Sequence, residues 1–431
     1  MIKVIITLLG ILVFTQAVYA SQNLPKVNQV ALQFAKEFSN NPTQIDNLFS
    51  KNFIKRNTNS KNWLINTYKE NGQVTKVEPV KIYSNRTGKF NFFFSNQTYL
   101  PITIVLLNNY KIQNTEVGYK TNLNDSFLKI VNDLKKWPGK NSLTIKYISE
   151  NNKNVVNYNS NKIFPIASSF KLYVLGALYH AIHNKQLKWN DIIHINHKYN
   201  TLTPELPQEG GTIEYWPNHA PVTLQTLATL MIQKSDNTAA DTLIHIVGRK
   251  NIEAILKNMG DNNSELMVPF CTIKQYNLMI HKPSIGREYL KAKTVSKKLE
   301  ILEELTKQKT PNWHDYANFD LASEGLAYRA STSDLCNAMI WFGKSTHFNT
   351  NSTVLQILAS FGPKFGGFKY VGLKGGSFGT NTLNTFTMTY LIENKNDKWF
   401  TVSISCQDAN EPINIQNVNL LMNRVFILLN K

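Results

Sequence analysis

The motif Phe164-Pro165-Ile166-Ala167-Ser168-Ser169-Phe170-Lys171 is followed at once by an apolar run, 172–175. On a helix, Ser168 and Lys171 would share one face, because residues three apart are neighbours. A serine hydroxyl becomes a nucleophile when a nearby neutral amine accepts its proton. The apolar run would desolvate Lys171 and favour its neutral form. Alone this pattern is weak, since any serine three positions before a lysine matches it.

A second motif, Ser235-Asp236-Asn237, lies between two apolar stretches, 224–232 and 239–247, which we expect to be helices. A serine here can pass a proton to a leaving group, and an asparagine can donate a hydrogen bond to a substrate amide. The competing interpretation is a helix N-cap, for which all three residue types are favoured.

A third motif, Lys374-Gly375-Gly376, precedes Ser377. Two glycines allow a strand backbone to lie close to a ligand, and Lys374 would bind an anionic carboxylate. The competing interpretation is a hairpin turn.

Together and in this order, the motifs resemble the S-x-x-K, S-D-N and K-T-G set of class A β-lactamases and penicillin-binding proteins, over about residues 123–431. This resemblance to the serine β-lactamase superfamily implies an antiparallel sheet flanked by helices, plus an all-helical lobe. It also implies roles: Ser168 as nucleophile, Lys171 as general base, Ser235 with Lys374 as proton relay, and Asn237, Gly376 and Ser377 as substrate-binding residues. The backbone N–H groups of Ser168 and Ser377 would form the oxyanion hole.

Two departures from the family pattern affect the expected chemistry. Glycine replaces the threonine of the third motif, and no E-x-x-L-N stretch supplies the glutamate that activates the deacylating water in class A enzymes. None of the carboxylates after Asn237 stands in that context: Glu265, Asp315, Asp320 and Glu324. We therefore expect an acyl-enzyme that forms readily and hydrolyses slowly.

Residues 21–121 predict a separate α+β domain. Helices are expected at 27–39, 43–53 and 60–68, and strands at 74–77, 80–83, 91–94, 99–107 and 110–119. This order resembles the NTF2-like fold. Joined to a β-lactamase-like domain that lacks the deacylating glutamate, it also resembles the β-lactamase-like esterases associated with clavam biosynthesis.

From residue 122 onward the pattern predicts a second α+β unit, the hydrolase domain. Asp125 is the expected N-cap of a helix over 126–137. Strands are expected at 143–148, 154–158, 370–374, 386–392 and 400–406, and helices after Ser168 to about 184, at 224–233, 237–247 and 415–429. The lysine-rich segment 294–309 is expected to be a solvated helix.

The first twenty residues have the three parts of a signal peptide: Lys3, an apolar run from Val4 to Phe14, and Val18-Tyr19-Ala20 before the expected cleavage. A membrane anchor is the alternative, but the run is short for a bilayer span. We therefore expect a periplasmic or secreted protein.

The 431 residues carry 47 Lys+Arg and 29 Asp+Glu, a formal net charge of +18. The lysines are spread along the chain without a basic, aromatic-rich stripe, so we expect a solvated surface rather than nucleic-acid binding. The three cysteines, Cys271, Cys336 and Cys406, form no disulfide framework, although one bridge is possible. No Cys or His cluster has metal-ligand spacing, and no cofactor is expected.

The sequence thus predicts an exported serine hydrolase whose partner is a small β-lactam or ester, or a peptidoglycan stem peptide. A D,D-carboxypeptidase, an esterase acting on substituted β-lactams, a penicillin-binding sensor and an inactive scaffold remain alternatives.

Overall fold

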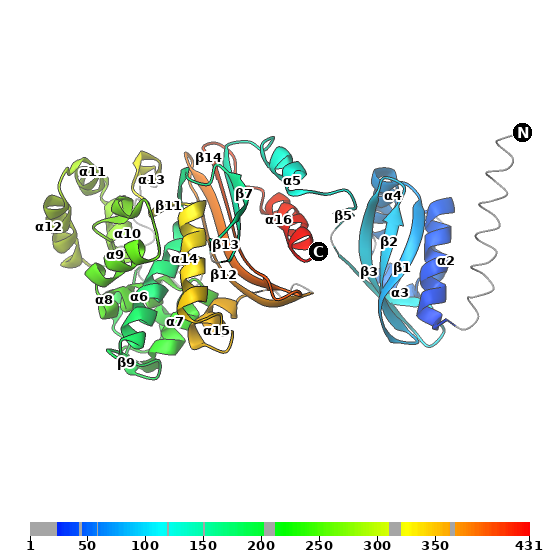
Figure 1. The fold of residues 1–431 in the computed structure, drawn as a ribbon, viewed down its shortest axis with the longest axis horizontal. Helices are drawn as coiled ribbons and strands as arrows, with labels where there is room; N and C mark the ends of the chain where they lie inside the picture. The colour runs from blue at the N-terminus through cyan, green and yellow to red at the C-terminus, as the bar shows by residue number, and fades with distance from the viewer. Residues whose placement is uncertain are drawn as a thin grey trace, which may run out of the picture. The chain divides into compact units, whose positions relative to one another are not determined.

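The computed structural model describes residues 24–42, 45–57, 59–118, 120–149, 151–201, 212–309, 320–362 and 367–431. The chain forms two compact units (Figure 1): unit 1 is Met1–Ser126 with Gln416–Leu428, and unit 2 is Phe127–Ile415 with Leu429–Lys431. The predicted signal peptide and Asp315 lie outside the described residues. In the part of the chain that is described, no helix has the length and apolar character to cross a membrane.

Unit 1 begins with helices, as predicted. They are α2 (Lys26–Asn40), the 3-10 turn η2 (Ile45–Leu48), α3 (Lys51–Arg56) and α4 (Ser60–Asn71). Along α2, Val27, Val30, Phe34 and Phe38 are buried. This spacing gives the helix one continuous apolar face that packs into the core of the unit.

An antiparallel sheet follows the helices. Its strands are β1 (Val74–Ser84), β2 (Thr87–Phe94), β3 (Thr98–Leu106), β4 (Ile112–Val117) and β5 (Thr121–Asn122), in the order β1-β2-β3-β4 with β5 paired to β3. The prediction of two strands at 74–77 and 80–83 was wrong, because both belong to β1. Pro79 lies within β1, next to a shift in register with β2. A proline is tolerated there because β1 is an edge strand.

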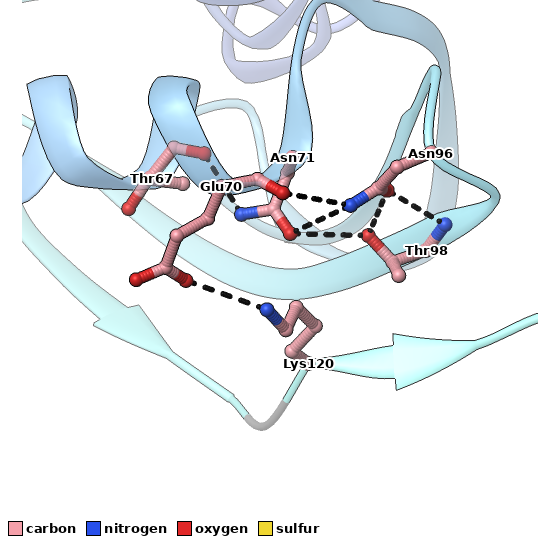
Figure 2. A network of polar contacts seen from close by, with 6 residues as sticks. All are labelled: Thr67, Glu70, Asn71, Asn96, Thr98 and Lys120. Carbon is pink, nitrogen blue, oxygen red and sulfur yellow. Dashed lines mark hydrogen bonds and ion pairs between the residues drawn. The ribbon is translucent and has the colours of Figure 1, made fainter.

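A polar network joins the end of α4 to the turn between β2 and β3 (Figure 2). The buried Asn71 amide donates to the Thr67 carbonyl oxygen at 2.8 Å, and its oxygen accepts from Asn96 at 3.2 Å and Thr98 at 3.3 Å. Glu70 and Lys120 form an exposed ion pair at 3.4 Å beside it. The buried polar atoms of Asn71 are therefore paired, and the network has a structural role.

Unit 2 is built on a second antiparallel sheet, as expected. Its order is β12-β13-β14-β6-β7, with β12 Phe368–Gly379, β13 Asn384–Asn394, β14 Trp399–Asp408, β6 Lys140–Tyr147 and β7 Asn154–Tyr158. The pairing of β14 with β6 joins strands from the two ends of the unit. The C-terminal strands are longer than predicted. Short ladders pair β8 (Ile163–Pro165) with β11 (Arg329–Ser331) and β9 (Ile192–His194) with β10 (Pro221–Thr223).

Helix α14 (Thr332–Ser345) packs along one face of this sheet (Figure 1). Buried hydroxyls line the sheet and satisfy one another there. The Thr332 hydroxyl lies 2.6 Å from that of Ser142 and 2.7 Å from that of Thr144. Two further hydroxyl pairs join β13 to β14, Thr387 with Ser405 and Thr389 with Ser403.

The expected helical lobe is present. It contains α6 (Lys171–His183), α7 (Leu224–Gln233), α8 (Asn237–Val247), α9 (Arg249–Asn258), α10 (Ile273–His281), α11 (Pro283–Lys291), α12 (Val295–Thr306), α13 (Leu321–Glu324) and α15 (Thr353–Ala359). Helices α7 and α8 have the predicted bounds. Helix α12 is not simply solvated, because Ile301, Leu302 and Leu305 are buried in a small core with α10 and α11.

Two helices remain, α5 (Phe127–Leu134) and α16 (Ile415–Leu429). Asp125 was predicted to cap α5, but its carboxylate accepts hydrogen bonds from Arg424, with N–O distances of 2.6 and 2.9 Å. This bidentate geometry is the arrangement in which an arginine–carboxylate pair is strongest.

Candidate active site

Ser168 lies in the 3-10 turn η3 (Ala167–Phe170), and α6 begins at Lys171. The turn differs from the predicted α-helix but keeps the two side chains together, because a 3-10 turn has three residues. Ala167 has a φ of 43°, a left-handed conformation that costs energy for a residue with a Cβ. The ring of Phe170 stacks on that of Tyr328 with centroids 3.8 Å apart, and this contact holds the turn in place.

Lys171 is fully buried, and its amine lies at the centre of the site. Nζ is 3.3 Å from Ser168 Oγ, 3.2 Å from Ser235 Oγ and 2.6 Å from Asn237 Oδ1. It also contacts the carbonyl oxygen of Ser235. A neutral amine has two N–H donors and one lone pair. It can donate to the Ser235 carbonyl and the Asn237 amide oxygen while its lone pair accepts the Ser168 proton.

The N-cap interpretation of the Ser-Asp-Asn motif is confirmed for Asp236, the middle residue. Asp236 is the N-cap of α8 and accepts from Ala239 N at 2.8 Å. Its other oxygen accepts from the backbone of Thr212 and Ile213, at 2.6 and 3.0 Å. Ser235, with a φ of 56°, and Asn237 instead turn their side chains to Lys171.

Lys374 reaches the same centre from β12. Its Nζ lies 3.1 Å from Ser235 Oγ, so the hydroxyl of Ser235 stands between two lysine amines. The hairpin interpretation of the third motif was wrong, because Lys374, Gly375 and Gly376 lie inside β12.

Gly376 brings β12 against the nucleophile. A methyl group at this position would collide with the backbone nitrogen of Ser168 and the carbonyl oxygen of Ile166. This close approach is why a glycine is required here. Ser377 follows and is exposed, as a substrate-binding residue must be. At Gly375, a methyl group would instead collide with the side chain of Met388.

Burial sets the protonation of both lysines. Desolvation, followed by the charge of Lys374, lowers the pKa of Lys171 well below its usual value, while Asp236 and Asp241 oppose the shift. Burial alone lowers the pKa of Lys374 to about 7. Burial therefore favours the neutral, basic form of Lys171, next to a second lysine whose pKa lies near neutral pH.

Asp241 was missed by the sequence reasoning. It is fully buried on α8 and accepts hydrogen bonds from the backbone of Ile273 and Lys274, at 2.7 and 2.8 Å. Burial raises the pKa of Asp241 to about 7, against those N–H donors and the charge of Lys171. Its position four residues after Asn237, on the same helical face, was the available signal.

None of the predicted carboxylates within the described ranges contacts Ser168 or Lys171. Glu265 is exposed, Asp320 accepts from the Thr382 hydroxyl at 2.7 Å, and Glu324 pairs with Arg287 at 3.0 Å. The oxygens of Asp241 are already occupied by backbone donors. None of these four carboxylates is therefore an evident base for deacylation.

The three cysteines are free thiols, with Cys336 and Cys406 buried, so the possible disulfide is not formed. Within the described residues, no group of three or more His, Cys, Asp or Glu side chains could hold a metal ion.

The geometry thus places a serine hydroxyl beside a buried amine, an arrangement that nucleophilic catalysis can use. Residues 124–316 match the model of the family described as "Beta-lactamase enzyme family". No curated protein matches the chain.

Solved structures with similar folds include penicillin-binding protein PBP-A (14% identity, TM-score 0.44, covering 69% of this chain and 94% of that one). Others are the extended-spectrum β-lactamase TLA-1 (16%, 0.49, 70% and 98%) and a β-lactamase from Chitinophaga pinensis (16%, 0.45, 66% and 91%).

The family match over residues 124–316 and the site geometry support a serine β-lactamase-like domain in this part of the chain. The protein is a serine hydrolase of the β-lactamase-like class. For unit 1, the resemblance to the NTF2-like fold stays a prediction.

Proposed function

We propose that the protein forms an acyl-enzyme on Ser168 with β-lactam, ester or peptide carbonyl substrates and releases it slowly. The observation that carries this proposal is the buried Lys171 amine, 3.3 Å from Ser168 Oγ. In its neutral form Lys171 takes the hydroxyl proton as Oγ bonds to the carbonyl carbon. The backbone N–H groups of Ser168 and Ser377 stabilise the negative charge on the carbonyl oxygen.

The leaving group then needs a proton. Ser235 Oγ lies between Lys171 and Lys374, at 3.2 and 3.1 Å, and can pass the proton from Lys171 to the departing nitrogen or oxygen. Lys171 returns to its neutral form as it gives Ser235 the proton that it took from Ser168, and the nearby Lys374 amine stabilises the Ser235 oxygen during the transfer. Asn237 and Gly376 hold the substrate beside Ser168.

Hydrolysis of the acyl-enzyme needs a base that activates water. Since none of the described carboxylates contacts the nucleophile, we expect this step to limit turnover. The leader-like residues 1–20 support export, so the enzyme would act in the periplasm or outside the cell.

The direct test is intact-mass spectrometry after incubation with penicillin G. We expect one adduct, carried by Ser168 and lost in Ser168→Ala. Ser169→Ala is the matched control, because Ser169 is the neighbouring serine and is fully buried. An adduct that persists in Ser168→Ala would overturn the assignment.

The time course of the penicillin G adduct separates two of the alternatives. A persistent adduct with no product indicates a penicillin-binding protein, and slow release indicates a weak β-lactamase. A second assay, with a stem peptide ending in D-Ala-D-Ala, would identify a D,D-carboxypeptidase by the release of D-alanine.

A further inference from the structure

Unit 1 contains a hollow of about 330 Å³ between its helices and its sheet. The walls come from α2, α3, α4, β3 and the residue Phe49 before α3, and their apolar side chains are Phe34, Phe49, Phe53, Leu64, Ile102 and Ile104. Protein interiors are close-packed, with few voids larger than a water molecule. A hollow of this size falls instead in the range of ligand pockets.

The hollow reaches from the core of the unit to its surface. Ile104 and Leu64, on the inner wall, are 1% and 2% exposed, whereas Val117, at the mouth, is 39% exposed. The rings of Phe49 and Phe53 stack with centroids 4.7 Å apart, which gives one wall a rigid aromatic surface. A small molecule could therefore enter from solvent and bury most of its surface.

The lining also restricts the charge of a ligand. No charged side chain is among the described residues that line the hollow, although the protein is strongly basic. An ionic ligand would lose its hydration there without a counter-charge. Polar groups come from Asn57, Asn59 and Thr115. The Asn57 amide nitrogen donates to the Phe53 carbonyl at 3.0 Å, which fixes the orientation of that side chain.

We propose that unit 1 is a binding module for a neutral small molecule with an apolar body and one or two hydrogen-bonding groups. The hollow has space for roughly ten water-sized groups, which matches a single ring system or a medium-length alkyl chain. The apolar body contacts the aromatic wall, and the polar end meets the asparagine and threonine side chains. This module is independent of the acyl-enzyme chemistry of unit 2.

The test uses the full chain and the neutral dye N-phenyl-1-naphthylamine, whose fluorescence rises in apolar surroundings. We expect saturable binding that 1-decanol displaces and that prior acylation of Ser168 does not change. Thr115→Trp should fill the mouth and weaken binding at least tenfold. The matched control is Asn114→Trp, because the preceding residue of β4 is exposed and does not line the hollow.

Val117→Trp is a second mouth variant, and it should weaken binding as Thr115→Trp does. Thermal melting and Ser168 acylation establish that each variant is folded. Absence of saturable binding to the wild type would overturn the proposal. So would binding that both mouth variants retain while folded, or binding that Ser168 acylation abolishes, since that would place the dye in unit 2.

Discussion

The hollow of unit 1 and the cluster of Ser168, Lys171, Ser235 and Lys374 in unit 2 bury opposite chemistry. Aromatic and aliphatic side chains line the first, without a charged group among the described lining residues. The second buries two lysine amines within hydrogen-bond distance of the same serine hydroxyl. Burial of apolar groups gives a place to bind, whereas burial of ionisable groups also shifts their protonation and so gives reactivity.

The largest effect on the acylation rate is expected when the buried amine of Lys171 is removed. Lys171→Met keeps the side-chain volume but removes the base, so the acylation rate should fall by about a hundredfold to ten-thousandfold. Quenched-flow labelling with a fluorescent penicillin measures it. The control is Lys146→Met. Lys146 is half-buried, and its amine donates hydrogen bonds to Ser333 and Asn337, not to Ser168. A Lys171→Met rate within tenfold of wild type would mean that another group is the base.

The next effect concerns the backbone beside the nucleophile. Gly376→Ala should push β12 away from Ser168 and disturb the oxyanion hole, which lowers the acylation rate by about a hundredfold to a thousandfold. Gly379→Ala is the matched control on the same strand, since its methyl group would meet only the side chain of Asn384. Equal rates for the two variants would show that the close approach at Gly376 has no catalytic role.

The sequence predicted which side chains meet at Lys171 better than it predicted their surroundings. Ser168, Lys171, Ser235, Asn237 and Lys374 could be found because short-range spacing and motif order carry them.

Contacts between residues far apart in the sequence could not be predicted. Asp241 reaches segment 273–274, and Asp125 reaches Arg424, through pairings that no local pattern encodes. In unit 1, Pro79 obscured the length of β1, because a proline is permitted only on an edge strand and the strand order was unknown.

A pH profile sharpens the comparison further. Lys171 must be neutral to act as base, so acylation should rise with pH through its lowered pKa. The positive charge of Lys374 assists the relay through Ser235, so the rate should fall above the Lys374 pKa of about 7. The acylation rate should therefore depend on pH as a bell-shaped curve, and both limbs report the coupled titration of the two lysines. Lys374→Met should abolish the falling limb, and a profile that stays bell-shaped would assign that limb to another group.

The smallest effect is on stability. Folded Lys374 loses its proton near pH 7, whereas the unfolded side chain keeps it to about 10.5. Between these values the unfolded state binds more protons, so the contribution of Lys374 to the free energy of unfolding rises with pH. The slope is at most about 1.4 kcal/mol per pH unit. Urea unfolding of wild type and Lys374→Met at pH 7 and 9 measures it. An unchanged difference would show that Lys374 keeps its charge when folded.

Stopped-flow mixing with a chromogenic cephalosporin tests the central claim most directly, since it resolves acylation from deacylation in one trace. Because Ser168 has its base and deacylation has none among the described carboxylates, we predict a burst of about one equivalent per enzyme, followed by a slow steady phase. Ser168→Ala should show neither phase. A linear trace with fast turnover and no burst would contradict the account, because it would require an efficient deacylating base at the site.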